Sequence, residues 1–341
     1  MSRSLASNRR LRVAACLIAA LATGCGGGGG EDIPPPPELL QITTGNQLAV
    51  ARATASIFVG LGGLSDVGII GSSAGPRASA AAGATKQALG RAVQAARAGD
   101  ARMRPLATYT VTDGCPAGGS ISITIDDRDN NGLPSAGDLM TMTFSDCRES
   151  ASTLVSGGVS VNISSASETQ LSGLFTFAQL AVVDGDNSFT TNGQANATYS
   201  ETTDPAGTLT ARTTMSVTAA GFVTAISVPG YGDTFTNDPN FSATWIDVMP
   251  LNGPGYTTSA LMGRVHVASL GGRIILDTNP PVHVWSTESY PDSGVVLVTG
   301  FQSKLRMNVL STTTVRLELD SNNDGTYEST RDVPWSELLP F

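Results

Sequence analysis

The sequence is poor in the residues that most enzyme sites and nucleic-acid sites require. Its 341 residues include two histidines and four cysteines, and acidic residues outnumber basic ones by 29 to 20. Nucleic-acid binding needs clustered Lys and Arg, so the charge balance argues against such a partner. The HExxH, CxxC and P-loop motifs are also absent. The sequence therefore offers no familiar metal-hydrolase, dithiol or phosphate-binding motif.

The remaining candidates for catalysis have simpler interpretations. His266 and His283 lie inside alternating segments, RVHVAS and PVHVW, so we interpret both as strand positions and assign no catalytic residue. The segment Gly71–Gly75 fits G-x-S-x-G, with Ser73 as the nucleophile of a serine hydrolase. A nucleophile elbow needs an α/β sheet, which the sequence does not predict. A serine hydrolase is therefore the third functional hypothesis, after the structural or binding module and the carrier that are described below.

The first 24 residues have the pattern of a secretory signal. Four arginines and no acid lie within the first 12 residues, and a short apolar run extends from Leu11 to Ala22. The run is shorter than the roughly 20 apolar residues that span a bilayer, and this combination is typical of a signal peptide. The following Leu21-Ala22-Thr23-Gly24-Cys25 resembles the lipobox of bacterial lipoproteins. The resemblance implies cleavage before Cys25 and a membrane anchor through lipid on Cys25.

Residues 25–37 are interpreted as a tether. Gly26–Gly30 is a flexible stretch and Pro34–Pro37 a stiff spacer. Gly26, in place of Asp, directly after the cysteine resembles the enterobacterial pattern for sorting to the outer membrane. The resemblance thus implies an envelope protein anchored in the outer membrane of a Gram-negative bacterium.

Cysteine usage agrees with export. Cleavage would remove Cys16, and lipid would occupy Cys25, which leaves Cys115 and Cys147 as the free pair. In an oxidising compartment they should form a disulfide. Closing a loop of that length is worth about 3–4 kcal/mol in the chain-entropy model.

The hydrophobic pattern predicts a helical segment at 38–104 followed by a β domain at 105–341, with two subdomains as an alternative. Helical spacing is found at Gln47–Val59, with Thr43 or Thr44 as N-cap and Gly60–Gly63 as the end, and again in the Ala-rich 78–98. From residue 106 the period changes to two. Alternating runs lie at Ser120–Asp126, Met140–Phe144, Val159–Ile163, Val295–Thr299, Leu305–Val309 and Thr314–Leu319. The predicted fold is mainly β: an antiparallel sandwich, a barrel-like arrangement or a long meander.

Two acidic loops have the spacing of a calcium loop, in which alternate residues supply oxygen ligands and a glycine at position 6 permits the turn. Both directly follow alternating strands, so neither is an EF-hand between helices, and the competing interpretation is a plain turn rich in Asp, Asn and Gly. The candidate calcium ligands of the first loop are Asp127, Asp129, Asn131, Leu133, Ser135 and Asp138. Those of the second are Asp320, Asn322, Asp324, Thr326 and Glu328, with Arg331 at position 12 unable to ligate. Any calcium would be structural.

Taken together, the Cys25 lipobox, the Cys115–Cys147 segment around DDRDNNGLPSAGD and the stretch TVRLELDSNNDGTYE resemble lipoproteins of Gram-negative bacteria. That resemblance implies no particular activity. We expect a non-enzymatic, membrane-tethered structural or binding module. The alternative is a carrier that holds lipid or another apolar ligand on the concave face of a curved sheet.

Overall fold

The computed structural model describes residues 39–66, 108–132, 134–148, 150–167 and 169–339. The chain divides into two compact units, Met1–Pro36 and Pro37–Phe341, and every described residue belongs to the second. The expected signal peptide, lipid-bearing Cys25, Ser73 motif and Ala-rich helix at 78–98 all lie outside the described residues.

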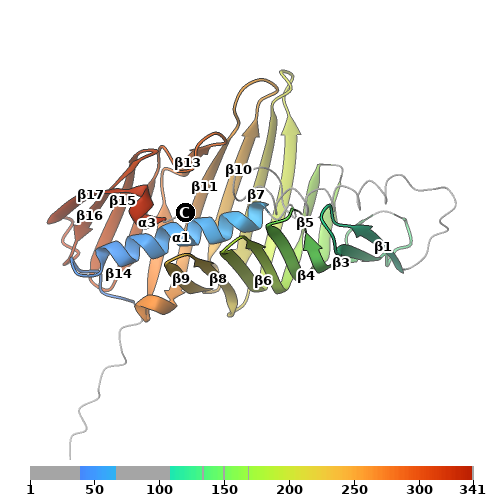
Figure 1. Ribbon diagram of the computed structural model, residues 1–341, viewed down its shortest axis with the longest axis horizontal. Helices are drawn as coiled ribbons and strands as arrows, with labels where there is room; N and C mark the ends of the chain where they lie inside the picture. Colours follow the sequence, from blue (N-terminus) through green and yellow to red (C-terminus); the bar gives the residue numbers. More distant parts are fainter. Residues whose placement is uncertain (1–38, 67–107, 133, 149, 168, 340–341) are drawn as a thin grey trace, which may run out of the picture. The chain divides into compact units, whose positions relative to one another are not determined.

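The described chain is mainly β, as the period-two pattern predicts, and its seventeen strands form one antiparallel sheet. The long helix α1 precedes all of them, and the other helical elements of the described residues are a short 3-10 turn, η1, and a four-residue helix, α3, after the last strand (Figure 1). The elements are α1 (Gln47–Asp66), β1 (Thr108–Gly114), β2 (Ser120–Asp126), β3 (Leu139–Arg148), β4 (Thr153–Ala166), β5 (Gln170–Asp184), β6 (Asn187–Thr203), β7 (Leu209–Val217), β8 (Phe222–Val228), β9 (Tyr231–Asn237), β10 (Ser242–Met249), β11 (Tyr256–Val267), η1 (Ala268–Leu270), β12 (Gly272–Thr278), β13 (Val282–Trp285), β14 (Val295–Gly300), β15 (Ser303–Ser311), β16 (Thr314–Asp320), β17 (Ser329–Pro334) and α3 (Trp335–Leu338).

The strands pair as a long meander that forks at β6 and again at β11. Strands β1 to β6 pair in chain order, as do β14 to β17. At the first fork, β6 pairs with β8 through residues 188–192 and with β7 through 195–203. One branch continues to β10 and the other to β9, and both rejoin on β11, which also pairs with β12 and β13. The pairing of β12 with β14 completes the sheet.

Alternation along each strand directs one side chain of every two into the core. In β2, for example, Ile121, Ile123 and Ile125 are buried, while the intervening Ser122 and Thr124 are only half-buried. The same alternation holds in β15 and β16. The period-two pattern therefore identified the buried face correctly.

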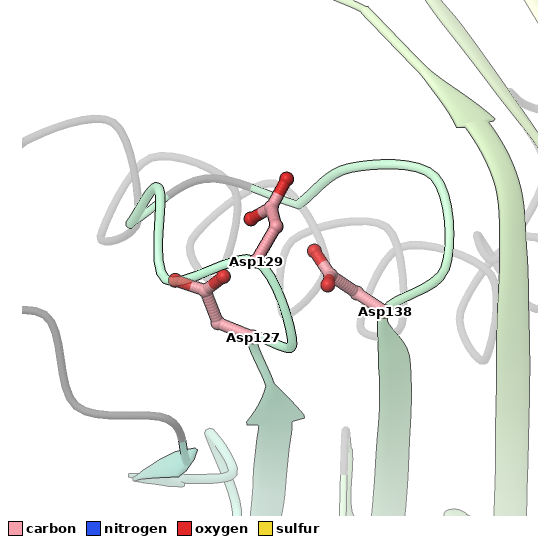
Figure 2. Close-up of side chains that lie close together, drawn as sticks. All are labelled: Asp127, Asp129 and Asp138. Carbon is pink, nitrogen blue, oxygen red and sulfur yellow. The ribbon is translucent and has the colours of Figure 1, made fainter.

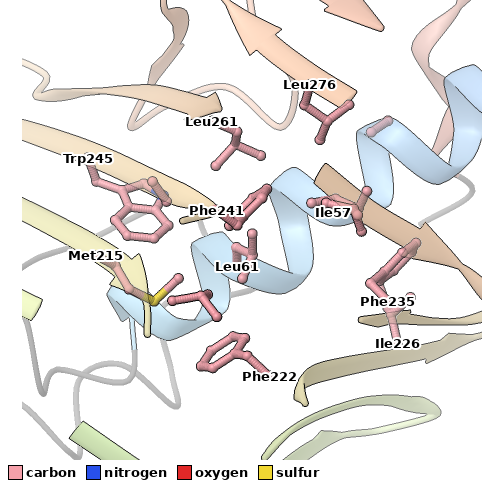
Figure 3. Packing of buried hydrophobic residues seen from close by; sticks show 14 of the residues in the cluster. Ile57, Leu61, Met215, Phe222, Ile226, Phe235, Phe241, Trp245, Leu261 and Leu276 are labelled. Atoms are coloured by element: carbon pink, nitrogen blue, oxygen red, sulfur yellow. The ribbon is translucent and has the colours of Figure 1, made fainter. Parts of the chain in front are cut away.

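Helix α1 lies along this apolar face and contacts β8, β11, β15 and β16 (Figure 1). Its Ile57 and Leu61 point into a cluster that includes Phe222 and Phe241 of the sheet side (Figure 3). The sequence predicted a helix end at Gly60–Gly63, but the helix continues to Asp66. Gly60 packs closely on the sheet, because a Cβ there would lie 3.3 Å from Cγ2 of Thr224. Tertiary packing thus outweighs the low helix propensity of glycine.

Three hydrogen bonds join the segment just before α1 to β12, to the turn after β14 and to the start of β15. Leu40 donates its N–H to the carbonyl of Arg273 at 2.8 Å and accepts from the N–H of Phe301 at 2.8 Å. Ile42 donates its N–H to Oγ of Ser303 at 2.8 Å. Gly300 is needed for this approach, since a Cβ there would lie 2.2 Å from the Leu40 carbonyl oxygen.

Candidate metal sites and their surroundings

The Cys115–Cys147 disulfide is present, with an S–S distance of 1.94 Å and a Cα–Cα distance of 5.4 Å. It joins the turn after β1 to the end of β3, where Cys147 is buried. The expected pairing is confirmed, and it closes a loop that contains the whole first acidic segment.

The first acidic loop connects β2 to β3 and brings three carboxylates together. Asp127, Asp129 and Asp138 face one another across the loop (Figure 2), and one ligand oxygen from each lies within 4.8 Å of the others. Asp127 is 1% exposed and Asp138 0%, whereas Asp129 is exposed. The group is therefore anchored by two buried charges and open at the third.

Backbone and hydroxyl donors hold these carboxylates in place. Asp127 accepts the N–H groups of Asn131 at 3.2 Å and Gly132 at 2.7 Å. Asp138 accepts the N–H of Ser135 at 2.8 Å and the N–H of Arg128 at 2.9 Å. The Ser135 hydroxyl bridges the group, because it lies 2.9 Å from Oδ2 of Asp129 and 3.1 Å from Oδ2 of Asp138. Leu133, which is also among the expected ligands, lies outside the described residues.

The second acidic loop connects β16 to β17 and gathers Asp320, Asp324 and Glu328, again with ligand oxygens within 4.8 Å of one another. Asp320 is 1% exposed. Thr326 takes part through its N–H, which donates to Asp324 at 2.7 Å, and Asn322 donates its amide to the same carboxylate at 3.0 Å. Arg331, at position 12, takes no part in this group as expected, and its guanidinium pairs with Glu337 at 2.9 Å.

The two loops share their backbone geometry over positions 1 to 6. At position 1, Asp320 accepts the N–H groups of Asp324 at 3.2 Å and Gly325 at 3.0 Å, as Asp127 accepts those of its own positions 5 and 6. Position 4 has a left-handed backbone in both, with φ of 58° at Asn130 and 60° at Asn323. The glycine at position 6 is also left-handed, with φ of 78° and 92°. The shared pattern explains why Gly stands at position 6.

Hydrogen bonds lower the pKa of an exposed carboxylate in each site, whereas the pKa of a tyrosine near the first site is raised. The pKa of Asp129 is lowered, chiefly by the hydrogen bond from Ser135, and that of Asp324 is lowered by the N–H of Thr326. Burial raises the pKa of Tyr109, and the nearby charges of Asp127 and Asp138 raise it further. Tyr109 and Arg128 therefore belong to the surroundings of the first site, although the sequence pattern gave no sign of either.

Such a group of oxygens suits a hard cation, because Ca²⁺ and Mg²⁺ bind carboxylate and carbonyl oxygens. The structure thus brings together Asp127, Asp129 and Asp138 in one group and Asp320, Asp324 and Glu328 in another. Of the other expected ligands, Asn131 and Asn322 direct their amide nitrogens at neighbouring carboxylates, at 2.8 Å and 3.0 Å. Both groups could hold a metal ion.

The histidines occupy strands, as expected. His266 is half-buried in β11 and His283 half-buried in β13. His283, however, also binds Asp292, with Nδ1 2.6 Å from Oδ1. No sequence signal pointed to this pair, since Asp292 lies in an irregular loop.

One open hollow lies against β6, β8, β9 and η1, with a volume of about 510 Å³. Its lining combines small polar residues, such as Ser188, Thr190 and Ser269, with the apolar Ala225 and Ile226.

Comparison of the chain with protein-family models, with curated proteins and with solved structures gives no match. Within the described residues, no helix is both long enough and apolar enough to cross a membrane. The function must therefore be argued from the sites themselves.

Proposed function

We propose that the chain is a non-enzymatic structural or binding module of the cell envelope, tethered through lipid on Cys25 and stabilised by calcium at its two acidic loops. One observation carries the proposal. Two loops far apart in sequence share their backbone geometry and hydrogen bonds over positions 1 to 6, each directly after a strand and each with a buried aspartate at position 1.

Calcium fits these loops better than magnesium. Magnesium requires a near-ideal octahedron and keeps much of its water, whereas calcium accepts six to eight oxygens in flexible geometry. The loops offer carboxylates at irregular spacing along a hairpin connection. Calcium modules outside the cell work with dissociation constants of about 10⁻⁴–10⁻³ M, which suits a structural role.

The stabilising mechanism is charge neutralisation. Asp127 and Asp138 are buried carboxylates in one small group, and like charges at this separation repel strongly where water is excluded. A bound cation replaces that repulsion with attraction and fixes the connection between β2 and β3. At the connection between β16 and β17 the repulsion is weaker, because Asp320 is buried but Asp324 and Glu328 are exposed.

The core favours a module over a carrier. Side chains of α1 pack against the apolar side of β8, β11, β15 and β16, which supports a filled core over an apolar ligand pocket. For the hydrolase alternative, the antiparallel sheet lacks the α/β arrangement that a nucleophile elbow requires.

Equilibrium dialysis of the full chain against ⁴⁵Ca tests the calcium component. We expect two sites, with one lost in Asp127→Ala/Asp129→Ala and the other lost in Asp320→Ala/Asp324→Ala. Asp126→Ala is the matched control, because Asp126 lies beside the first loop but pairs with Arg128 at 3.2 Å instead of joining the group. Binding that is undiminished in both double variants would contradict the assignment.

Membrane tethering is tested separately in a Gram-negative host. Labelled palmitate should enter the wild-type chain, which should sediment with membranes. Cys25→Ala should take up no label and appear in the soluble fraction. An unlabelled wild-type chain, or a labelled Cys25→Ala variant, would contradict the anchor without affecting the calcium sites.

A further inference from the structure

A cluster of three aromatic rings lies on the side of the sheet away from α1. Val282 of β13 points into the core, so alternation directs His283 and Trp285 to the opposite side. Tyr256 of β11 stands directly across from Trp285 in the strand register. The ring centroids of Trp285 lie 5.5 Å from Tyr256 and 5.0 Å from His283, both edge to face.

Trp285 is exposed and yet held in one orientation. Its side chain is on the surface, with 36% of the residue exposed. Its indole Nε1 donates to Oδ2 of Asp292 at 3.0 Å, and the same carboxylate binds Nδ1 of His283 and the hydroxyl of Ser293. Contacts with Tyr256 and His283 and this hydrogen bond together fix the ring, so its exposed part is held in one position on the surface.

The groups around the ring retain hydrogen-bonding capacity. A carboxylate offers about four lone-pair positions, and Asp292 uses three of them on His283, Ser293 and Trp285. Its side chain is 31% exposed. His283 uses Nδ1 for Asp292, and its Nε2 has no hydrogen-bond partner within the part of the chain that the structure describes.

A pyranose sugar matches this combination. Its ring has an apolar face of C–H groups, which stacks on a flat aromatic surface, and a rim of hydroxyls, which bond to a carboxylate or an imidazole. A rigid aromatic platform binds at a low entropic cost. The chain carries a net charge of −9, and Asp292 and the exposed Glu288 lie in the loop after β13, so an acidic glycan would be repelled.

We propose that Trp285, with Tyr256, His283 and Asp292, forms a surface site for a neutral carbohydrate, in which the sugar ring stacks on the indole and its hydroxyls bond to Asp292 and His283. The site lies apart from both acidic loops in the chain. Its failure would therefore leave the calcium sites and the lipid anchor untouched.

The indole signals of the ¹⁵N-labelled full chain, kept in calcium throughout, give a direct test. The three tryptophans are Trp245, Trp285 and Trp335, of which the first and last are buried. Titration with neutral hexasaccharides of glucose and of N-acetylglucosamine should shift the Trp285 signal alone, saturably, with at least one of the two sugars. Hexagalacturonate should shift none. No shift at Trp285 with either neutral sugar, or a response to the acidic one alone, overturns the proposal.

Calorimetry then distinguishes stacking on Trp285 from nonspecific binding to exposed aromatic side chains. Trp285→Ala should weaken binding of the active hexasaccharide at least about tenfold, as for a central aromatic contact. Phe301→Ala is the matched control, because Phe301 is an aromatic residue of similar exposure, 41%, in the turn after β14, and its affinity should equal that of the wild type. Trp285→Phe, whose smaller ring lacks the N–H that bonds to Asp292, should also bind more weakly than the wild type, and it covers the case in which Trp285→Ala does not fold. Equal affinity in the Trp285 variants, or a change in oligomeric state as their only effect, would contradict a sugar site.

Discussion

Removal of the Cys115–Cys147 disulfide should cost the fold a calculable part of its stability. The bridge joins residues 32 apart in sequence. In the chain-entropy model, a loop of that length restricts the unfolded chain by about 4 kcal/mol at 25 °C. The closed segment contains β2, the first acidic loop and nearly all of β3, and in this model the effect lies in the unfolded state.

The assay is denaturant unfolding of the full chain in oxidised and reduced buffer, beside Cys115→Ala/Cys147→Ala. Reduction keeps both sulfur atoms, whereas the double variant also truncates the buried Cys147 side chain. The double variant should therefore be slightly less stable than the reduced wild-type chain. In these denaturant titrations, reduction should lower the free energy of unfolding of the wild-type chain by about 4 kcal/mol.

The double variant is its own control, because reductant should leave its stability unchanged. A loss below about 1 kcal/mol on reduction would refute the reasoning. It would mean that the acidic loop and its flanking strands stay closed in the unfolded chain without the bridge.

Three further predictions concern the packing of α1, the contact between Gly300 and Leu40, and the dependence of stability on acidic pH. Ile57→Ala, at a buried position of α1, should lower the free energy of unfolding by about 2–5 kcal/mol in denaturant titrations, and Ile57→Val by only about 0.5–1.5; equal small losses would show that α1 packs loosely. Gly300→Ala forces a Cβ to within 2.2 Å of the Leu40 carbonyl oxygen and should cost about 1–3 kcal/mol, with faster proteolysis before α1 as the second readout; wild-type behaviour would place that segment elsewhere. The pKa of Asp292 is lowered, because hydrogen bonds from His283 and its neighbours outweigh the opposing effect of burial. Its contribution is therefore present above the ordinary value of 3.8 and lost as pH falls through the folded value. Asp292→Asn should flatten the acid side of a stability–pH curve below about pH 4, and an unchanged curve would contradict this.

Much of the fold was predictable because period two is a local signal. The alternation at Ser120–Asp126 and Thr314–Leu319 places every second residue in the core, and both segments are strands with that pattern. Local spacing could not reveal the fork at β6, because the division of one strand between β7 and β8 depends on long-range pairing. The end of α1 was wrong for a similar reason, since the contact of Gly60 with Thr224 comes from a strand far along the chain.

The candidate sites likewise include one kind that local sequence predicts and one kind that only the folded chain reveals. The acidic loops are contiguous in sequence, so the spacing of Asp127, Asp129 and Asp138 was enough to predict that they meet. The cluster around Trp285 was missed, because its members come from two strands and a loop, and only the register of β11 with β13 brings them together.

Thermal melts in calcium, magnesium and chelator test most directly whether the module is pinned by calcium. At about 10 mM metal and a dissociation constant of about 10⁻⁴–10⁻³ M, each occupied site should add about 1.4–2.7 kcal/mol. We predict that calcium raises the melting temperature of the full chain above that in chelator, that magnesium does so far less, and that Asp127→Asn with Asp129→Asn loses about half of the calcium effect. Identical melting temperatures of the wild-type chain in all three conditions would contradict the account and reduce both loops to hairpin turns.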